Sequence, residues 1–204
     1  VKISSVTYYG RVFGFGDNSG DDNILLSRYS NQGTFTAHIY TDTTRTLQID
    51  NVGTLNDPAE WVHLVLVCGE TVKLYQDGIL IGSASHSGIP TKTRANHYLG
   101  KGNWTTDGGI SGTIAFFRVY NRILSANEVG SIYDNRNFVS TVHPIDLTGL
   151  QLWLDATNID GQNNKTLTDG AEIGEWNDAR WNDNVSGATK HFADGAASGN
   201  ALFK

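Results

Sequence analysis

The amino-acid sequence predicts an all-β fold of the sandwich or jelly-roll type. Strand-like segments of about four to eight residues alternate with turns rich in glycine, asparagine and aspartate, which is the spacing typical of such folds. The 204 residues include 23 glycines, and long runs of the strong helix formers Ala, Glu, Lys and Leu are nearly absent. A helical protein is therefore disfavoured.

The first part of the chain is expected to form strands at Tyr9–Phe15, Ile24–Arg28, Thr34–Tyr40 and Thr46–Asp50. Each of them is closed by a polar or glycine-containing turn, which is the usual boundary of a strand. Between the first two, the sequence GDNSGDDN from Gly16 to Asn23 is expected to be a loop.

The middle of the chain is expected to contain a hairpin and further strands. In Trp61–Cys68 both alternating faces are apolar, which is typical of a strand covered on both sides. In Thr71–Ala84 two short apolar runs are joined through Asp77-Gly78, and Asp-Gly is a strong hairpin signal because glycine accepts the positive φ of a tight turn. Short strands follow at Tyr98–Gly100 and Gly112–Tyr120.

A short helix is expected directly after the last of these strands. Ser125 and Glu128 fit a capping box, in which the serine hydroxyl accepts from an amide of the first turn and the glutamate reaches back. Val129, Ile132 and Tyr133 follow at helical spacing. We therefore expect an amphipathic helix of about two turns that packs on the sandwich.

Composition and charge exclude several classes of function. The net charge is −6 with acids and bases interspersed, so a surface that neutralises nucleic-acid phosphates is not expected. No apolar run approaches the length of a membrane span, and no signal peptide opens the chain. Because the sequence contains no methionine, we expect it to be an interior piece of a longer protein. The single cysteine, Cys68, cannot form an intrachain disulfide and is expected to be a buried thiol.

The pattern of the chain changes near residues 138–147. There the strand pattern lapses and Pro144 appears. The remaining segment holds only a few short apolar runs, too few to bury a core of its own. We therefore expect a domain at residues 1–139 whose first strands lie upstream of Val1, a linker at 140–149, and the N-terminal part of a second β domain at 150–204.

Four motifs occur in an order that resembles the laminin-G-like, concanavalin-A-like lectin/glucanase domain. They are WVHLVLV from Trp61, VKLYQDG from Val72, YLG from Tyr98 and GTI…RVYNR…LS…EV from Gly112. The resemblance extends from about Tyr9 to Tyr133. It implies a two-sheet antiparallel jelly-roll sandwich with one short C-terminal helix.

A second resemblance begins at Leu150. The sequences LQLWLDATNIDG and EIGEWNDAR are similar to the first part of another concanavalin-A-like domain, which implies a tandem array. In the first domain, many relatives carry an acid just after the Gly-x-Ile of the last strand, whereas this chain has Ala115 and Phe116. We therefore expect apolar packing or a protein contact at these two positions.

The resemblance raises the possibility of glycoside hydrolysis, because hydrolases share this fold. Retaining hydrolysis uses two carboxyl groups about 5 Å apart, and in these hydrolases the acids follow the spacing acid-x-acid-x-x-acid on one strand. No predicted strand here has that spacing; Glu172, Glu175 and Asp178 are spaced three and three and are interpreted as solvated. His63 is interpreted as structural. No catalytic residue and no enzymatic activity are expected.

Trp104 is the main candidate for ligand binding. It lies in the loop KGNWTTDGG, where its neighbours are polar and no core-facing periodicity explains a tryptophan. Aromatic platforms with polar partners on loops are typical of sugar sites. Asn103, Asp107 and Tyr98 complete the candidate ligand site.

A calcium site is a further possibility in the loop before Ile24. Calcium needs six to eight oxygen ligands, and this loop supplies the carboxylates of Asp17, Asp21 and Asp22. The loop does not follow the EF-hand pattern. Asp107 is a second candidate cation ligand.

Three functions remain open at this point. The first is a non-catalytic recognition or cell adhesion module, binding a glycan or a protein surface, within a larger extracellular or particle-surface protein. The second is a purely structural virion component, such as a minor capsid or fibre protein, that uses the sandwich for assembly with neighbouring domains or chains. The third is an accessory domain of a glycoside hydrolase.

Overall fold

The computed structural model describes residues 1–5, 8–17, 21–55, 60–89, 91–104, 106, 108–134, 148–155, 172–173, 175–176, 192–193 and 201–202. Its elements are β1 (Lys2–Ser5), β2 (Arg11–Asp17), β3 (Asp21–Arg28), β4 (Phe35–Thr41), β5 (Thr44–Val52), β6 (Leu64–Val67), β7 (Thr71–Gln76), β8 (Ile79–Ser85), β9 (Asn96–Leu99), β10 (Ser111–Thr113), β11 (Phe116–Tyr120), α1 (Ala126–Asp134), β12 (Leu150–Asp155), β13 (Glu172–Ile173), β14 (Glu175–Trp176), β15 (Phe192–Ala193) and β16 (Ala201–Leu202). The protein is mostly β, as predicted. No helix in the described ranges is long and apolar enough to cross a membrane.

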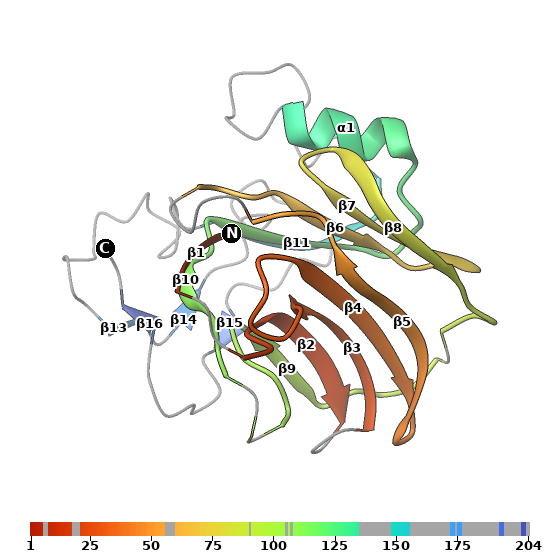
Figure 1. Cartoon of the computed structure of the whole chain (residues 1–204), viewed down its shortest axis with the longest axis horizontal. Coiled ribbons are helices and arrows are strands. Elements are labelled where there is room, and N and C mark those ends of the chain that lie inside the picture. The colour runs from red at the N-terminus through yellow and green to blue at the C-terminus, as the bar shows by residue number, and fades with distance from the viewer. Residues whose placement is uncertain are drawn as a thin grey trace. The chain divides into compact units, whose positions relative to one another are not determined.

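The chain divides into two compact units. The first comprises Val1–Thr113 and Ile123–Val142, and the second comprises Ile114–Arg122 and His143–Lys204. The first unit contains a five-stranded sheet with the order β5-β4-β3-β2-β9, a three-stranded sheet with the order β6-β7-β8, and the pair β1-β10 (Figure 1). All of these pairings are antiparallel.

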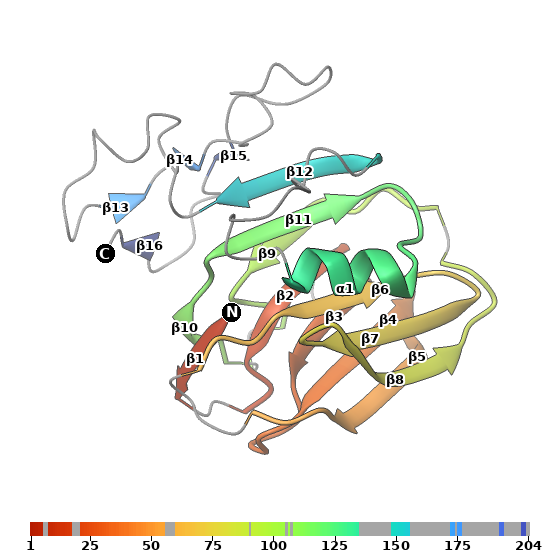
Figure 2. The same ribbon diagram turned by 90° about the horizontal axis from the view of Figure 1, so that it is seen from above.

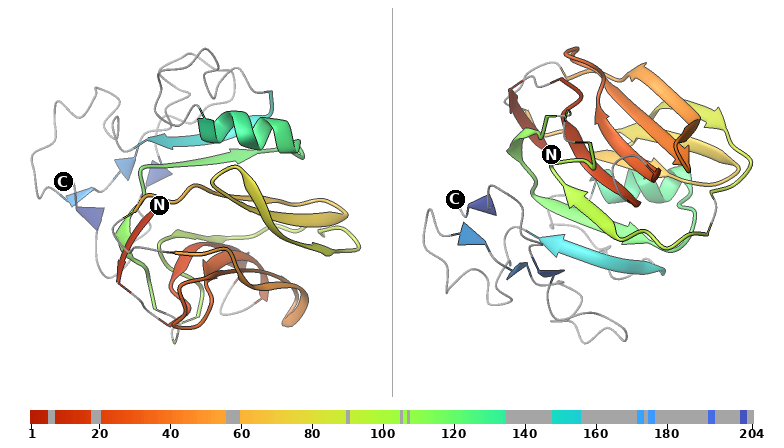
Figure 3. Two further views of the ribbon diagram at one scale, coloured as in Figure 1. Left: turned by 45° about the horizontal axis from the view of Figure 1, so that its top comes forward. Right: turned by 90° about the horizontal axis from the view of Figure 1, so that it is seen from below.

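The two larger sheets of the first unit face each other across the hydrophobic core. Figure 3 shows them as separate layers. The buried core residues come from both sheets and from the segments beside them: Ile3, Val12, Leu26, Phe35, Ala37, Ile39, Leu47, Ile49, Val62, Val72 and Leu74. Because successive strand residues point to opposite faces, the alternate residues of the five-stranded sheet lie on a second face, directed away from this core.

The predicted hairpin is confirmed. β7 and β8 are joined by Asp77 and Gly78, whose φ angles are 51° and 81°. Two consecutive positive φ angles are the signature of a type I′ turn, in which glycine is favoured because it has no Cβ.

The predicted helix is also confirmed, together with its capping box. The backbone N–H of Ser125 donates to Oε2 of Glu128 at 2.8 Å, and the backbone N–H of Glu128 donates to Oγ of Ser125 at 3.3 Å. Figure 2 shows α1 beside the β7–β8 hairpin. The Tyr133 ring lies 5.9 Å from the His63 ring, so the helix packs within the first unit and His63 takes part in that packing.

The single strand predicted over Gly112–Tyr120 is wrong. The structure has two strands, β10 and β11, with Ile114 and Ala115 between them outside any strand. The reason is a change of partner, since β10 pairs with β1 whereas β11 pairs with β12. A strand that changes partner must leave one ladder before it enters the next, and the local sequence does not carry that information.

The second unit contains antiparallel pairs of strands: β11 with β12, β13 with β16, and β14 with β15. In β11, the Arg118 guanidinium lies 4.2 Å from the centroid of the Phe116 ring. Both Ala115 and Phe116 are half-buried. Phe116 therefore has a packing partner, as the apolar sequence at this point predicts.

The loop predicted over Gly16–Asn23 is partly wrong. β2 continues to Asp17, and β3 already begins at Asp21, which lies opposite Asp17 in the ladder. The polar composition of this stretch predicts a loop, whereas residues 16–17 and 21–23 belong to the two strands. Residues 18–20 lie outside the described residues, as does the predicted linker up to residue 147. The division into domains at 140–149 therefore stays a prediction.

Candidate functional site

The candidate site is built on the face of the five-stranded sheet that is directed away from the core. The alternation in β4 shows how the sequence makes this face. Phe35, Ala37 and Ile39 are buried in the core, while the alternate residues Thr36, His38 and Tyr40 lie on the opposite side. The outer face therefore carries polar and aromatic side chains.

Trp104 lies over this outer face. Its ring centroid is 5.3 Å from that of Tyr40, with the two planes inclined by 56°. The guanidinium carbon of Arg11 lies 5.1 Å from the Trp104 ring centroid, within cation–π distance. We call these three residues, Trp104, Tyr40 and Arg11, the Trp104 surface. The indole is half-buried, so part of it remains accessible.

Arg11 is held in place beneath the indole. Its side chain is almost fully buried, and its Nη1 donates to Oγ of Ser27 at 3.0 Å on the neighbouring strand β3. Its guanidinium also lies 5.8 Å from the Tyr9 ring centroid. A cation fixed in this way holds the tryptophan in a defined orientation.

The loop that carries Trp104 is fastened to the sheet. Nδ2 of Asn103 donates to Oδ1 of the fully buried Asn23 at 2.7 Å. The backbone N–H of Gly100 donates to the carbonyl of Val12 at 2.9 Å. The loop can approach so closely because Gly16 has no side chain; a Cβ at this position would lie 2.6 Å from Nδ2 of Asn103.

A buried polar network lies beside Tyr40. Nε2 of His38 is 2.6 Å from Oδ1 of Asp50 and 2.9 Å from Oγ1 of Thr36, and the Thr36 hydroxyl donates to the carbonyl of Ile49 at 2.9 Å. Burial lowers the pKa of His38, although the hydrogen bond to Asp50 opposes this change. At neutral pH the imidazole is therefore uncharged. Its hydrogen bonds hold the polar side chains of this network in place.

The residues predicted for ligand binding have different surroundings in the structure. Trp104 and Asn103 lie in one loop, although the Asn103 amide is engaged with Asn23 and holds the loop. Tyr98 lies on β9 opposite Gly14, and the Lys101 ammonium is 4.8 Å from its ring centroid. Asp107 lies outside the described residues.

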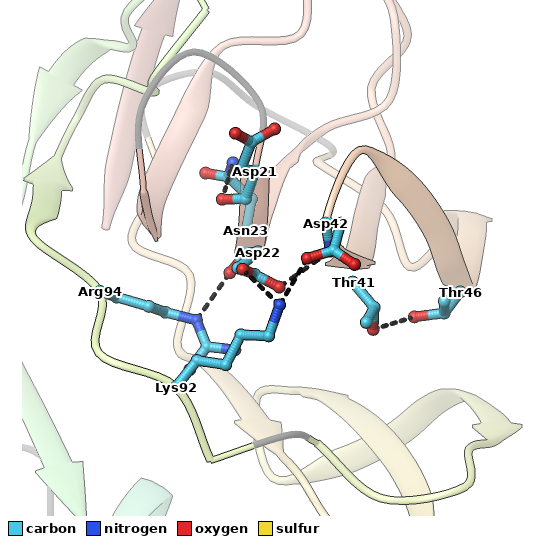
Figure 4. Close-up of polar contacts among 8 residues, drawn as sticks. All are labelled: Asp21, Asp22, Asn23, Thr41, Asp42, Thr46, Lys92 and Arg94. Atoms are coloured by element: carbon cyan, nitrogen blue, oxygen red, sulfur yellow. Dashed lines mark hydrogen bonds and ion pairs between the residues drawn. The ribbon is translucent and has the colours of Figure 1, made fainter.

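The predicted calcium ligands are arranged differently from a metal site. Asp17 and Asp21 are cross-strand neighbours, whereas the Asp22 carboxylate forms an ion pair with Lys92 at 2.9 Å (Figure 4). Within the described ranges, no three His, Cys, Asp or Glu side chains are grouped as metal ligands would be. The residues present there do not fit the oxygen-rich shell that calcium requires.

Sequence reasoning did not find Arg11, Tyr40, His38 and Asp50. A signal was present, because alternate residues of the strand Thr34–Tyr40 are polar or aromatic while the intervening ones are apolar. Such a pattern indicates a strand with one face on the core and a polar outer face. What the pattern could not indicate is that the loop carrying Trp104 folds onto this face.

Comparison with known proteins identifies the fold. A family model described as the concanavalin A-like lectin/glucanases superfamily matches residues 1–130. The crystal structure of a candidate carbohydrate binding protein from Bacteroides ovatus ATCC 8483 matches with a TM-score of 0.58 and 15% identity, covering 97% of this chain and 50% of that one. This chain thus spans half the length of that protein.

A crystal structure of an S-layer domain-containing protein (residues 221–444) from Clostridium thermocellum ATCC 27405 matches with 20% identity and covers 65% of this chain and 66% of that one. Its TM-score of 0.32 is too low to show a shared fold. No curated protein matches. The family model covers well over half of the 204 residues and agrees with the antiparallel sheets and the short helix α1 of the described residues. The chain therefore belongs to the concanavalin A-like lectin/glucanases superfamily.

Proposed function

We propose that this chain is a non-catalytic carbohydrate-binding module of a larger surface protein, and that it binds its glycan at the Trp104 surface. The observation that carries the proposal is the placement of Trp104, whose partly exposed indole contacts Tyr40 and Arg11 on the outer face of a sheet. An indole that only filled the core would not need a cation and a second ring to fix it on this face.

The chemistry of this face suits a sugar. A sugar ring presents an apolar C–H face and a rim of hydroxyl groups, so it needs an aromatic platform with hydrogen-bonding groups beside it. The Trp104 ring offers the platform. On β5, in the same sheet, Gln48 is exposed and donates to the partly exposed Asp50 carboxylate, so this sheet also carries polar groups that a ligand could reach. The fixed orientation of the indole lowers the entropy that binding would cost.

The comparisons support a binding module without fixing its ligand. The superfamily includes both lectins and glucanases by name. The similar protein from Bacteroides ovatus is described as a candidate carbohydrate binding protein, and at 15% identity it shows the fold alone. We favour binding over hydrolysis because Asp50, a carboxylate on the outer face of the same sheet, is hydrogen-bonded to His38. Retaining hydrolysis needs two carboxyl groups about 5 Å apart on either side of the scissile bond.

A glycan array on the folded chain tests this proposal. We expect binding to one class of glycan, followed by a Kd measurement by calorimetry on the best ligand. Removing an aromatic anchor at the centre of an interface typically costs 2 kcal/mol or more, so Trp104→Ala should weaken binding by about 30-fold or more.

Trp61→Ala is the matched control. Trp61 is 53% exposed and belongs to neither the Trp104 surface nor the loop that carries it, so its removal should leave the Kd unchanged. A glycan bound equally well by Trp104→Ala would refute the assignment of the site. Silence of the wild-type chain across the array would refute carbohydrate binding and favour the structural role in an assembly.

A further inference from the structure

The Trp104 surface continues on the side of Arg11. The guanidinium carbon of Arg11 lies 5.1 Å from the Trp104 ring centroid and 5.8 Å from the Tyr9 ring centroid, so this cation lies against two aromatic rings. The Tyr9 ring in turn meets the Tyr8 ring edge to face, with centroids 4.7 Å apart and planes inclined by 86°. We call Tyr8, Tyr9, Arg11, Trp104 and Tyr40 the aromatic row.

Tyr8 is the exposed end of the aromatic row. It is 61% exposed, although its ring packs against Tyr9. Large apolar side chains that are exposed singly are common on protein surfaces. Tyr8 differs from these because its ring is connected to the Trp104 surface through Tyr9 and Arg11. The row therefore has two accessible aromatic rings, Tyr8 and Trp104, with two side chains between them.

The backbone fixes the segment that carries the two tyrosines. The N–H of Tyr9 donates to the carbonyl of Ser30 at 3.0 Å, which ties this segment to the residues that follow β3. Tyr9 has a φ angle of 45°, an uncommon left-handed conformation for a bulky residue. Such a conformation persists only where the surrounding structure enforces it. The Tyr9 ring is also 6.1 Å from the Tyr29 ring, so both the backbone and the side chain of Tyr9 are held.

The segment of Tyr8 and the loop of Trp104 meet at Gly108. The N–H of Gly108 donates to the carbonyl of Tyr8, and the N–H of Arg11 donates to the carbonyl of Gly108, both at 3.4 Å. Gly108 belongs to the same loop as Trp104. The two segments that carry the exposed rings are thus joined by backbone hydrogen bonds, which holds these rings at a defined separation.

The chemistry of the row repeats along its length. Tyrosine and tryptophan each present an apolar ring face together with a polar group. Burial raises the pKa of Tyr9, and Tyr29 adds to this effect. The Tyr9 phenol therefore keeps its proton and can both donate to and accept from a sugar hydroxyl. A chain of sugar units repeats the complementary combination of apolar ring faces and hydroxyl groups.

We propose that the aromatic row binds an extended glycan chain, in which one sugar unit stacks on Trp104 and another unit of the same chain stacks on Tyr8. This inference rests on the proposed function and specifies its ligand class, an oligosaccharide or polysaccharide chain rather than a single terminal sugar. Two contacts made by one ligand raise its affinity, because the second contact forms within the complex that the first has made.

The test measures how affinity depends on the length of the glycan. The probes are oligosaccharides of defined length, from disaccharide to hexasaccharide, of the sugar class that the glycan array selects, and the Kd of each is measured by calorimetry. The Kd of the wild type should fall by about fivefold or more from the disaccharide to the hexasaccharide. In Tyr8→Ala most of this gain should be lost, whereas Tyr8→Phe, which keeps the ring, should retain it.

The matched control is Trp61→Ala, which removes another exposed aromatic ring and should keep the gain with length of the wild type. Trp104→Ala should weaken binding at every length. If Tyr8→Ala does not fold, Tyr8→Leu takes its place, because leucine fills the space without offering a flat ring.

Two results would overturn this inference alone. One is a glycan that binds through Trp104 with the same Kd at every length. The other is a Tyr8→Ala variant that keeps the gain with length of the wild type. Both would leave the proposed carbohydrate binding intact. Silence of the wild type across the array would overturn the proposed function and this inference with it.

Discussion

Replacing Gly16 by alanine is the sharpest test of how the sheet supports the Trp104 loop. Gly16 lies on β2 and is buried. A Cβ there would overlap the side-chain amide of Asn23 and lie 2.6 Å from Nδ2 of Asn103, closer than real Cβ contacts occur. Because Asn23 is fully buried, it cannot move away, so the hydrogen bond between Asn103 and Asn23 must break.

The size of the effect follows from two costs. Leaving the buried Asn23 carbonyl oxygen without its donor costs about 1–3 kcal/mol, and forcing a methyl group into a filled space costs about 1–3 kcal/mol. Gly16→Ala should therefore lower the free energy of unfolding by about 2–6 kcal/mol. It should also weaken glycan binding, because the broken bond is the one that holds the loop of Trp104.

Gly14→Ala provides a control on the same strand and the same face. A Cβ at Gly14 would lie 3.6 Å from Cα of Gly102 and 3.7 Å from the carbonyl oxygen of Lys101, which are ordinary contacts. We expect a change below about 1 kcal/mol, since alanine also restricts the unfolded chain. Urea unfolding measures both variants. A free energy of unfolding of Gly16→Ala within about 0.5 kcal/mol of the wild type, the range usual for neutral surface substitutions, would contradict this prediction.

Two further predictions follow from shifted pKa values. Because burial lowers the pKa of His38, the unfolded chain binds the proton more readily, so the free energy of unfolding should decrease as the pH falls below about 6.5. Urea titrations from about pH 8 to pH 5 should show that the free energy of unfolding depends less on pH in His38→Gln than in the wild type. An equal pH dependence in the two proteins would contradict the assignment of this effect to His38. Burial also raises the pKa of the Cys68 thiol to about 11. Because the thiolate is the reacting form, alkylation by iodoacetamide at pH 8 should be about a hundredfold slower in the folded protein than in urea. Equal alkylation rates in the two states would contradict this prediction.

Local signals in the sequence predict much of the fold. The Asp77-Gly78 turn and the capping box of Ser125 and Glu128 are correct because both depend on residues that are neighbours along the chain. The strand at Thr34–Tyr40 is correct because its alternation reports directly which side chains face the core. The family resemblance is correct for residues 1–130 because its motifs combine such local patterns in a fixed order.

The features that escape prediction depend on contacts between distant parts of the chain. The break at Ile114 and Ala115 follows from a change of partner strand, which no local pattern reveals. The acidic stretch around Asp22 suggests a cation site by its oxygens, but the cation that meets it is an ammonium 70 positions further along the chain. Likewise, the sequence identifies Trp104 as a loop tryptophan. It does not indicate that the Trp104 ring lies against Arg11, because this contact depends on how the loop folds onto the sheet.

The proposed carbohydrate site is tested most directly by observing Trp104 itself during binding. Fluorotryptophan labelling gives each of the five tryptophans its own fluorine resonance, and Trp104→Phe and Trp61→Phe assign the two that matter. Titration with the best glycan of the array should shift the Trp104 resonance and leave the Trp61 resonance in place. A glycan that binds while the Trp104 resonance stays unmoved would contradict the account.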